Sequence, residues 1–300
     1  MMLITGIELT GFLMYGIMLQ VHGRQMRTYL QNFFGGTRLA VSGFLSPGSH
    51  VHQQDEPWHP YLLRFGLHRM PKPASGHRVH QYMALAAYLG IPIGRVSFEV
   101  PIEARHIEDA ERVIEDYGLR DREIIGVMRR TSRPMRDWKK ESFYSTIDSI
   151  VEDLGHDVVV FGAEPEGNLN SRHVVDLRGK TSFPIDVYLT RYSGVCKVIV
   201  GPDTGMMHIA GSVSSNQDGT YDEKTQGNRT VSIFGPTNYA TYGPYDPTRR
   251  FNLAVQPDLG NVKMSFWGVP DFDRKDYMAM VKSGMVIEKV ERHLKKMAVR

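Results

Sequence analysis

The chain has 300 residues, of which 41% are hydrophobic, so it can bury a large core, and its length favours two domains. Its 36 Lys and Arg residues nearly balance 33 Asp and Glu residues, which argues against nucleic-acid binding driven by overall charge. The single cysteine, Cys196, excludes a disulfide framework and a cysteine-based zinc site, and it fits a reducing cytoplasm.

Residues 1–21 are apolar but do not have the pattern of a signal peptide or a membrane span. No Lys or Arg precedes the run, and Glu8 interrupts it. We expect a helix that leads into a buried strand. The protein is therefore expected in the cytoplasm, either soluble or peripheral at the inner face of the membrane.

Residues 1–118 have an irregular pattern, and we assign them to an N-terminal domain. A stretch rich in Pro, His and Gly divides this region at 46–76. The expected elements are a helix and a strand through Val21, a helix at 27–34, a strand at 38–43, and helices at 77–89 and 107–117.

Residues 119–285 alternate short β-branched runs with amphipathic stretches, which predicts a parallel sheet flanked by helices. A helix at 139–154 follows the first strand, and Gly155 ends it. The polar segment 214–229 is predicted to be a surface loop away from the ligand crevice, and 286–300 to be a closing helix. The predicted strands are 124–128, 157–161, 173–177, 197–201 and 230–234.

The strongest chemical signal is the strand, turn and helix start at 198–211. Asp203 or Thr204 can cap the helix, and Gly205 lets a ligand approach the backbone, so the free amides form an anion site. His208 lies one helical turn after Thr204 and faces the same anion. A capped helix with a packed histidine is the alternative.

A second anion loop follows the strand at 124–128. Thr131 and Ser132 offer hydroxyl groups, and guanidinium groups suit phosphate oxygens. Two such loops at carboxyl ends of strands favour one pyrophosphate bound across a switch point, with a solvated basic loop as the alternative. The guanidinium groups come from Arg129, Arg130, Arg133 and Arg136.

Three further turns could complete a nucleotide site. Glu164 follows a strand that ends in glycine, an arrangement that suits the two hydroxyls of a ribose. Lys180 and Thr181 lie after the next strand and could line a base pocket. The turn Phe-Gly-Pro-Thr at 234–237 could shape the mouth of the crevice.

In order and spacing, these elements resemble the C-terminal domain of a family 9 glycosyltransferase, the family of the bacterial heptosyltransferases. The resemblance is strong from Ile124 to Tyr245 and extends weakly into the N-terminal region, through 19–44 and 80–90. The motifs that carry it are the Thr131-Ser132 loop with Arg136 and Trp138, the Gly-Ala-Glu turn at 162–164, Gly-Lys-Thr-Ser at 179–182, Pro-Asp-Thr-Gly-Met-Met-His at 202–208 and Phe-Gly-Pro-Thr at 234–237.

The resemblance implies an α/β fold of two facing Rossmann-like lobes, the GT-B arrangement. In that arrangement residues 1–118 would form the partial, acceptor-side lobe and residues 119–285 the lobe that binds the nucleotide-sugar donor. It implies transfer of a sugar, typically heptose from an ADP-linked donor, to lipopolysaccharide or another cell-envelope glycan, by inverting displacement without a metal or other cofactor. It places Thr131, Ser132 and Arg136 on the donor phosphate and sugar, Glu164 on the ribose, Thr181 near the base, and Asp203, Thr204, Gly205 and His208 on the pyrophosphate.

The N-terminal lobe departs from the family pattern. The first βα unit, whose aspartate is the general base in the family, has no counterpart, so we expect an incomplete lobe that self-associates through an open sheet edge. His22 follows an apolar strand and is our candidate base. The histidines at 50 and 52 have loop composition, and we expect no metal site there.

Two other functions remain open. One is a degenerate, non-catalytic relative that binds a nucleotide sugar or acts as a partner subunit, because the family's catalytic segment is absent. The other is a nucleotide-dependent Rossmann enzyme such as a dehydrogenase. The absence of a Gly-x-Gly-x-x-Gly motif after any predicted strand counts against the dehydrogenase.

Overall fold

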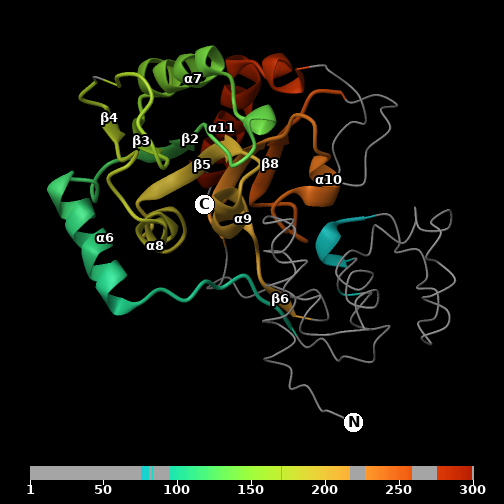
Figure 1. Cartoon of the computed structure of the whole chain (residues 1–300), viewed down its shortest axis with the longest axis horizontal. Helices are drawn as coiled ribbons and strands as arrows, with labels where there is room; N and C mark the ends of the chain where they lie inside the picture. Colours follow the sequence, from blue (N-terminus) through green and yellow to red (C-terminus); the bar gives the residue numbers. More distant parts are fainter. Residues whose placement is uncertain are drawn as a thin grey trace, which may run out of the picture. The chain divides into compact units, whose positions relative to one another are not determined.

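The computed structural model describes residues 76–80, 83, 95–169, 171–216, 227–258 and 276–298 (Figure 1). The chain divides into two compact units, residues 1–92 and 93–300. In the first unit, the described residues of the helix predicted at 77–89 are helical at 78–80 and 83. The other elements predicted before residue 76, His22 and the proposed open edge lie outside the described residues and stay predictions.

The second unit contains one main sheet, a two-stranded ribbon and the helices around them. The strands are β1 (Arg95–Val96), β2 (Ile124–Met128), β3 (Asp157–Phe161), β4 (Val174–Asp176), β5 (Cys196–Pro202), β6 (Ser215–Asn216), β7 (Arg229–Ile233) and β8 (Asn252–Val255). The helices are α6 (Ala104–Asp116), α7 (Lys140–Glu152), α8 (Phe183–Val187), α9 (Gly205–Gly211), α10 (Tyr239–Tyr242) and α11 (Ser283–Ala298), with short turns η4 (Pro134–Arg136), η5 (Tyr188–Tyr192) and η7 (Tyr277–Met280).

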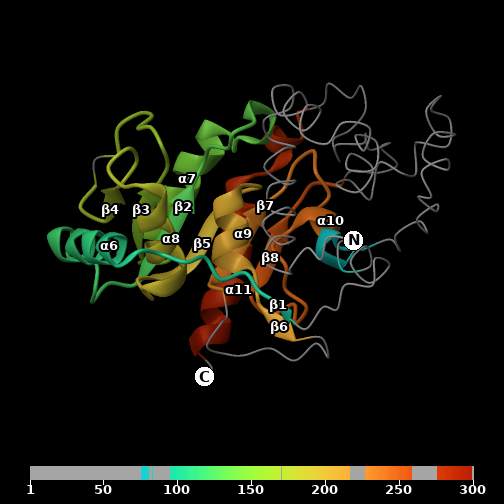
Figure 2. The same cartoon turned by 60° about the horizontal axis from the view of Figure 1, so that its bottom comes forward.

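The main sheet has six parallel strands in the order β4-β3-β2-β5-β7-β8 (Figure 2). From β2 the chain moves outward through β3 to β4, returns to β5 beside β2, and then moves outward through β7 to β8 on the other side. The strand order therefore reverses between β2 and β5. In open parallel sheets, ligands bind outside the carboxyl ends of the strands at such a reversal.

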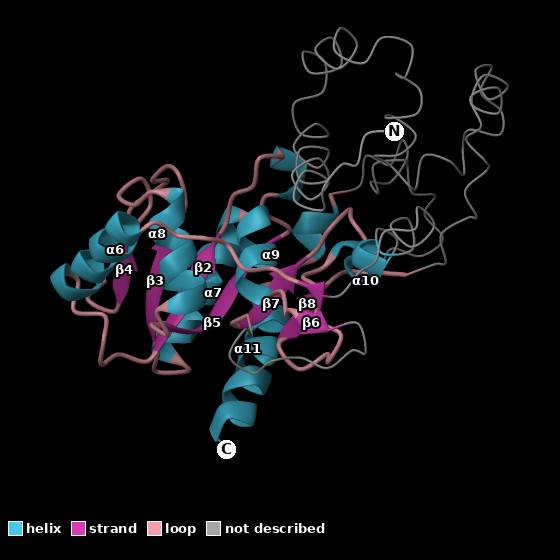
Figure 3. Ribbon diagram, turned by 90° about the horizontal axis from the view of Figure 1, so that it is seen from below, coloured by secondary structure: helices cyan, strands magenta, loops and turns pink. Residues whose placement is uncertain are grey.

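Side-chain alternation along the strands produces a hydrophobic core on each face of the sheet. Ile125 and Val127 point into a cluster under α7 and α11, whereas Ile124 and Met128 point into a cluster under α6, α8 and α9. Figure 3 shows the row of strands flanked by these helices. Gly126 lies between neighbours so close that a Cβ atom there would be 2.8 Å from Ile199 Cδ1.

Most predicted elements of this unit are confirmed. β2 and β3 have the predicted bounds, and β4, β5 and β7 differ from the prediction by one residue at each end. The short strand β8 was not predicted. The structure also includes α6 and α11 in the same compact unit as the sheet, whereas the sequence prediction set domain boundaries at 118 and 285.

The prediction of a surface loop at 214–229 was wrong at both described ends. Ser214 and Ser215 are only 1% and 3% exposed, and β6 pairs with β1 in antiparallel orientation. The Ser214 hydroxyl accepts a hydrogen bond from the amide of Phe98 at 3.1 Å. At the other end, Asn228 donates to the carbonyls of Thr190 and Cys196. Polar residues misled the prediction because their side chains bind neighbouring backbone groups. Residues 217–226 lie outside the described residues.

Candidate functional site

Three loops meet at the carboxyl ends of β2, β5 and β7, and their side chains converge on Asp203. This residue directly follows β5 and is 8% exposed. Arg136, from the loop after β2, pairs through Nη1 with Asp203 Oδ2 at 2.7 Å. Thr237, after β7, donates through Oγ1 to the same oxygen at 2.8 Å. His208 Nε2 lies 3.3 Å from Asp203 Oδ1. The cluster therefore occupies the point at which the strand order reverses.

Electrostatics keep this cluster charged. Burial acts to raise the pKa of the Asp203 carboxyl, but the hydrogen bond with His208 and the charge of Arg136 outweigh it, so the pKa lies below its ordinary value. Burial lowers the pKa of Arg136, and the charge of Asp203 opposes that effect. An arginine nevertheless remains protonated at neutral pH. The ionised carboxylate of Asp203 therefore orients the side chains of Arg136 and His208 at the carboxyl edge of the sheet.

The start of α9 adds backbone donors beside these side chains. Thr204 caps the helix, and its Oγ1 accepts a hydrogen bond from the amide of Met207 at 3.3 Å. No described residue accepts a hydrogen bond from the amides of Gly205 and Met206. Arg136 Nε is likewise buried without a hydrogen-bond partner. These groups give the cluster unused donor capacity, which an anionic ligand could satisfy.

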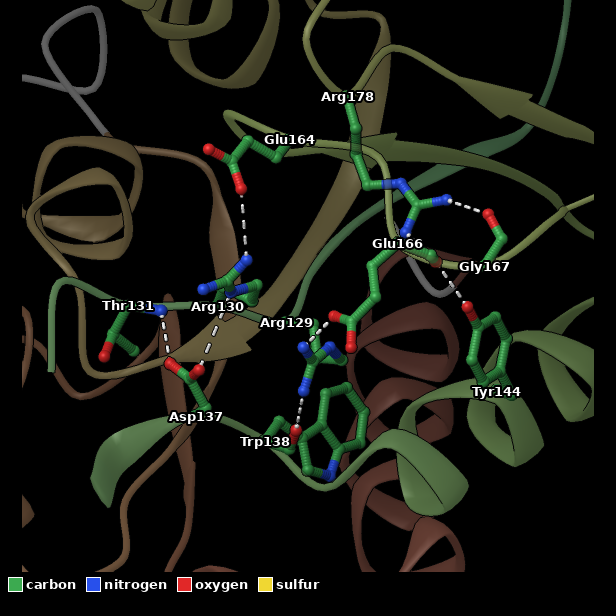
Figure 4. A network of polar contacts seen from close by, with 10 residues as sticks. All are labelled: Arg129, Arg130, Thr131, Asp137, Trp138, Tyr144, Glu164, Glu166, Gly167 and Arg178. Atoms are coloured by element: carbon green, nitrogen blue, oxygen red, sulfur yellow. Dashed lines mark hydrogen bonds and ion pairs between the residues drawn. The ribbon is translucent and has the colours of Figure 1, made fainter. Parts of the chain in front are cut away.

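The loop after β2 has its own internal order (Figure 4). The amide of Thr131 donates to Asp137 Oδ1 at 2.7 Å. The hydroxyl of Thr131 donates to the carbonyl of Arg133 at 2.6 Å. Ser132 is exposed. The hydroxyl of Thr131 therefore stabilises the loop in this structure, while that of Ser132 faces solvent. Their predicted contacts with donor phosphate stay predictions.

The residues predicted for ribose and base follow the next two strands along the same edge. Glu164 comes after β3, is 77% exposed, and lies 3.5 Å from Arg130 Nη1. Lys180 comes after β4 and lies over the ring of Tyr117, with Nζ 5.7 Å from the ring centroid. Since β4, β3 and β2 are neighbours, these positions continue the row that begins at the Asp203 cluster. Their roles stay predictions.

Thr181 is engaged with a carboxyl group that sequence reasoning missed. Its hydroxyl donates to Asp186 Oδ1 at 2.5 Å, at the start of α8. Burial raises the pKa of Asp186 to about 6, although the hydrogen bond from Thr181 acts in the opposite direction. The hydroxyl of Thr181 is therefore already used within the protein. A nucleobase bound beside Thr181 would therefore contact other atoms of the 179–182 turn.

The structure thus brings together Arg136, Asp203 and His208, with Thr204 and Gly205 at the adjoining helix start. Sequence reasoning missed the direct bond from Thr237 to Asp203. The available signal was a threonine at the carboxyl end of a predicted strand, in the Phe-Gly-Pro-Thr turn. That signal was insufficient because the pairing of β5 with β7, which sets the contact, had to be known.

The described residues contain neither a cluster of metal-binding side chains nor a helix that could cross a membrane. No three His, Cys, Asp or Glu side chains in this part of the chain lie close enough together to bind a metal ion. Nor does any helix in the described ranges combine the length and apolar composition needed to cross a membrane.

Comparison with known proteins assigns the family. The sequence model of glycosyltransferase family 9 (heptosyltransferase) matches residues 43–265, well over half of the chain. The chain belongs to glycosyltransferase family 9. The resemblance stated from the motifs is thereby confirmed. No curated protein sequence matches this member of the family significantly.

Solved structures of similar proteins support the fold. A family 9 glycosyl transferase from Veillonella parvula shares 18% identity with a TM-score of 0.54, over 76% of this chain and 62% of that one. ADP-heptose lps heptosyltransferase II from E. coli shares 19% identity with a TM-score of 0.52, over 79% of this chain and 68% of that one. At these identities the likeness confirms the predicted α/β fold class. This family 9 chain spans less than two thirds of the length of the Veillonella protein.

Proposed function

We propose that this family 9 protein transfers a sugar from a nucleotide diphosphate sugar to a cell-envelope glycan such as lipopolysaccharide. The observation that carries the proposal is the Asp203 cluster at the reversal between β2 and β5. The cluster holds an arginine and a histidine beside unbonded amides of a helix start, and a diphosphate needs donors of this kind. We place the reaction in the cytoplasm, with peripheral contact at the inner face of the membrane.

In this proposal, the diphosphate lies against Arg136, His208 and the start of α9. Asp203 contributes by orienting the two side chains, because a carboxylate would repel phosphate oxygens directly. The loop after β2 contributes Thr131 and Ser132 to the phosphate and sugar. The ribose lies toward Glu164, and the base lies toward Lys180 and Thr181, which follow β3 and β4 along the same edge.

The proposed donor is ADP-linked heptose. The E. coli relative is named an ADP-heptose heptosyltransferase, and the family description names heptosyltransferase without a nucleotide. Binding of the adenine and ribose along β3 and β4 would present the diphosphate to Arg136 and leave the sugar beyond it. The sugar would then lie toward the side from which the acceptor approaches.

The proposed chemistry is an inverting displacement. The oxygen of an acceptor hydroxyl attacks the anomeric carbon, and the bond from that carbon to the diphosphate oxygen breaks. Arg136, His208 and the α9 amides stabilise the charge that develops on the departing diphosphate, so these groups could supply the stabilisation without a metal. The proton of the hydroxyl passes to a base, for which we propose His22. His22→Gln should retain nucleotide binding and lose transfer, and unchanged turnover would reject His22 as the base.

Calorimetric titration with ADP, UDP and GDP tests the donor site. Native protein should bind ADP most tightly, and Asp203→Ala should lose that binding. Asp203→Asn provides a second variant of similar size in case the alanine variant does not fold. Asp157→Ala is the matched control, because Asp157 also contacts an arginine and a histidine, at the other end of the sheet. Absence of nucleotide binding by the native protein would overturn the proposal.

A transfer assay with the preferred donor separates catalysis from binding alone. Release of the nucleoside diphosphate that depends on a glycan acceptor would support the transferase. Nucleotide-sugar binding without acceptor-dependent release would instead favour the alternative function of a non-catalytic binding protein.

A further inference from the structure

Glu166 is the residue at which three separate elements meet in the loop after β3 (Figure 4). Its carboxylate forms an ion pair with Arg129, the first residue after β2. Its backbone carbonyl accepts hydrogen bonds from the Tyr144 hydroxyl at 2.6 Å and from Arg178 Nη1 at 2.7 Å. Tyr144 belongs to α7, and Arg178 follows β4. The loop after β3 is therefore fixed to β2, α7 and β4 through one residue.

Arg129 also closes the loop after β2. Its Nη1 donates to the carbonyl of Trp138 at 2.9 Å, and the amide of Trp138 donates to the carbonyl of Arg129 at 3.0 Å. Trp138 is fully buried and packs edge-on against Phe143 of α7. One guanidinium group thus joins both ends of the 129–138 loop to Glu166 in the next loop.

The backbone of the loop after β3 is adapted to the contact between Tyr144 and the carbonyl of Glu166. Gly167 has φ of +68°, and a Cβ atom there would lie 2.3 Å from the Tyr144 hydroxyl oxygen. The glycine therefore lets Tyr144 reach the carbonyl of Glu166. Arg178 is itself fixed by a two-pronged contact with Asp176, through Nε at 2.8 Å and Nη2 at 2.7 Å.

The Arg129 pair differs from the other contact between the same two loops. The side chain of Arg129 is 15% exposed, whereas Arg130 is 50% exposed and lies 3.5 Å from Glu164 and 3.7 Å from Asp137. Exposed pairs at such distances contribute little, since water and salt screen them. The Arg129 contact, in which Glu166 is 35% exposed, is better sheltered than the Arg130 contact with Glu164, and its guanidinium group is also bonded to the backbone of its own loop.

We infer that Arg129 is a positioning residue for the nucleotide-sugar donor, and that it acts through its ion pair with Glu166. The inference rests on the proposed function, which places donor phosphate at 131–136 and ribose at Glu164. Arg129 fixes the spacing of these two loops, so that their groups face a single ligand. The pattern of the sequence indicates Arg129 as a phosphate ligand, but the structure uses its guanidinium group within the protein.

The test compares ADP binding to native protein, Arg129→Gln, Glu166→Gln and the double variant. Arg129→Gln should weaken binding roughly tenfold to a hundredfold, the range seen when residues that orient the ligands of a metal are removed. If Arg129 acts through Glu166, the double variant should bind little worse than Arg129→Gln alone. Losses that multiply in the double variant would overturn the inference in favour of direct phosphate contact.

Arg122→Gln is the matched control. Arg122 precedes β2, is 23% exposed, and pairs with Asp157 at 2.6 Å at the amino end of the sheet, away from the proposed site. We expect its removal to leave ADP affinity unchanged. Hydrogen exchange should show faster exchange at 130–138 and 162–169 in Arg129→Gln, and not in Arg122→Gln.

The outcomes separate the inference from the proposed function. Native protein that binds no nucleotide overturns the proposed function itself. Native protein that binds ADP, with equal binding by Arg129→Gln, overturns only the positioning role. Equal loss of affinity in Arg122→Gln and Arg129→Gln also overturns that role, because it shows general destabilisation.

Discussion

Two carboxylates at opposite ends of the sheet have nearly the same partners. Asp157, the first residue of β3, contacts Arg122 Nε at 2.6 Å and His173 Nδ1 at 2.8 Å. Asp203, directly after β5, contacts Arg136 at 2.7 Å and His208 at 3.3 Å. Each cluster is thus an aspartate with an arginine and a histidine. The types of residue in a cluster do not show which of the two serves a ligand.

The two clusters differ in their surroundings. The hydrogen bond from Arg122 lowers the pKa of Asp157, which burial opposes, so both aspartates are ionised at neutral pH. Only Asp203 accepts a third hydrogen bond from a buried hydroxyl, that of Thr237, and only Asp203 adjoins a helix start with unbonded amides among the described residues. Position at the carboxyl end of a parallel sheet, rather than composition, distinguishes the candidate binding cluster from the structural one.

Removing the arginine from each cluster should produce the largest difference in ADP affinity between the two clusters. Arg136→Gln should weaken ADP binding at least about 30-fold, since the loss of one member of a sheltered charged contact costs roughly 2–5 kcal/mol. Arg122→Gln should bind ADP as native protein does and should show only a lower free energy of unfolding. Calorimetric titration and denaturant unfolding measure the two quantities.

The same two variants can also contradict the proposed difference between the Asp203 and Asp157 clusters. Equal losses of ADP affinity in Arg122→Gln and Arg136→Gln would mean that the two ends of the sheet do not differ in function. Arg136→Lys sharpens the result, because it keeps the charge but lacks the planar fork. We expect its affinity to lie between those of native protein and Arg136→Gln.

Much of the fold of the second unit could be predicted because its strands are continuous β-branched runs buried on both faces. β2 and β3, for example, contain Ile-Ile-Gly-Val-Met and Asp-Val-Val-Val-Phe. β8 could not be predicted, since Asn-Leu-Ala-Val is short and its asparagine is not typical of a strand. Asn252 is nevertheless buried there, because its side-chain amide donates to the carbonyl of Gly211.

The sequence could predict which loops form the candidate site, but not all of the contacts within it. Loops after parallel strands share one edge of the sheet, so the neighbourhood of Arg136 and Asp203 follows from chain order. The contacts of Thr237 with Asp203 and of Arg129 with Glu166 depend on strand pairing and on rotamers, which local patterns do not contain. The predicted role of Arg129 illustrates the difference, because a basic residue in a loop resembles a phosphate ligand until its partners are known.

Removing the third hydrogen bond on Asp203 should have an intermediate effect. Thr237 is 1% exposed, so Thr237→Val keeps the shape of the side chain but leaves Asp203 Oδ2 with Arg136 alone. We expect ADP affinity to fall about tenfold, since hydrogen bonds to charged groups contribute roughly 1.5–3 kcal/mol. Thr237→Ser retains the hydroxyl and should retain most of the affinity. Calorimetric titration of both variants is the measurement, and equal affinities would show that the hydroxyl is not needed.

The smallest effect on ADP affinity is expected at Glu164, a carboxylate that is exposed, unlike those of Asp203 and Asp157. Because Glu164 is 77% exposed and its contact with Arg130 is long, Glu164→Gln should leave the free energy of unfolding unchanged. If its carboxylate accepts the ribose hydroxyls, ADP affinity should fall about fivefold, as expected for the loss of roughly 1 kcal/mol. Titration with ADP and 2′-deoxy-ADP identifies the contact, because native protein should prefer ADP and Glu164→Gln should not. If Glu164→Gln still prefers ADP to 2′-deoxy-ADP, another group accepts the ribose hydroxyls, and the ribose does not lie at Glu164.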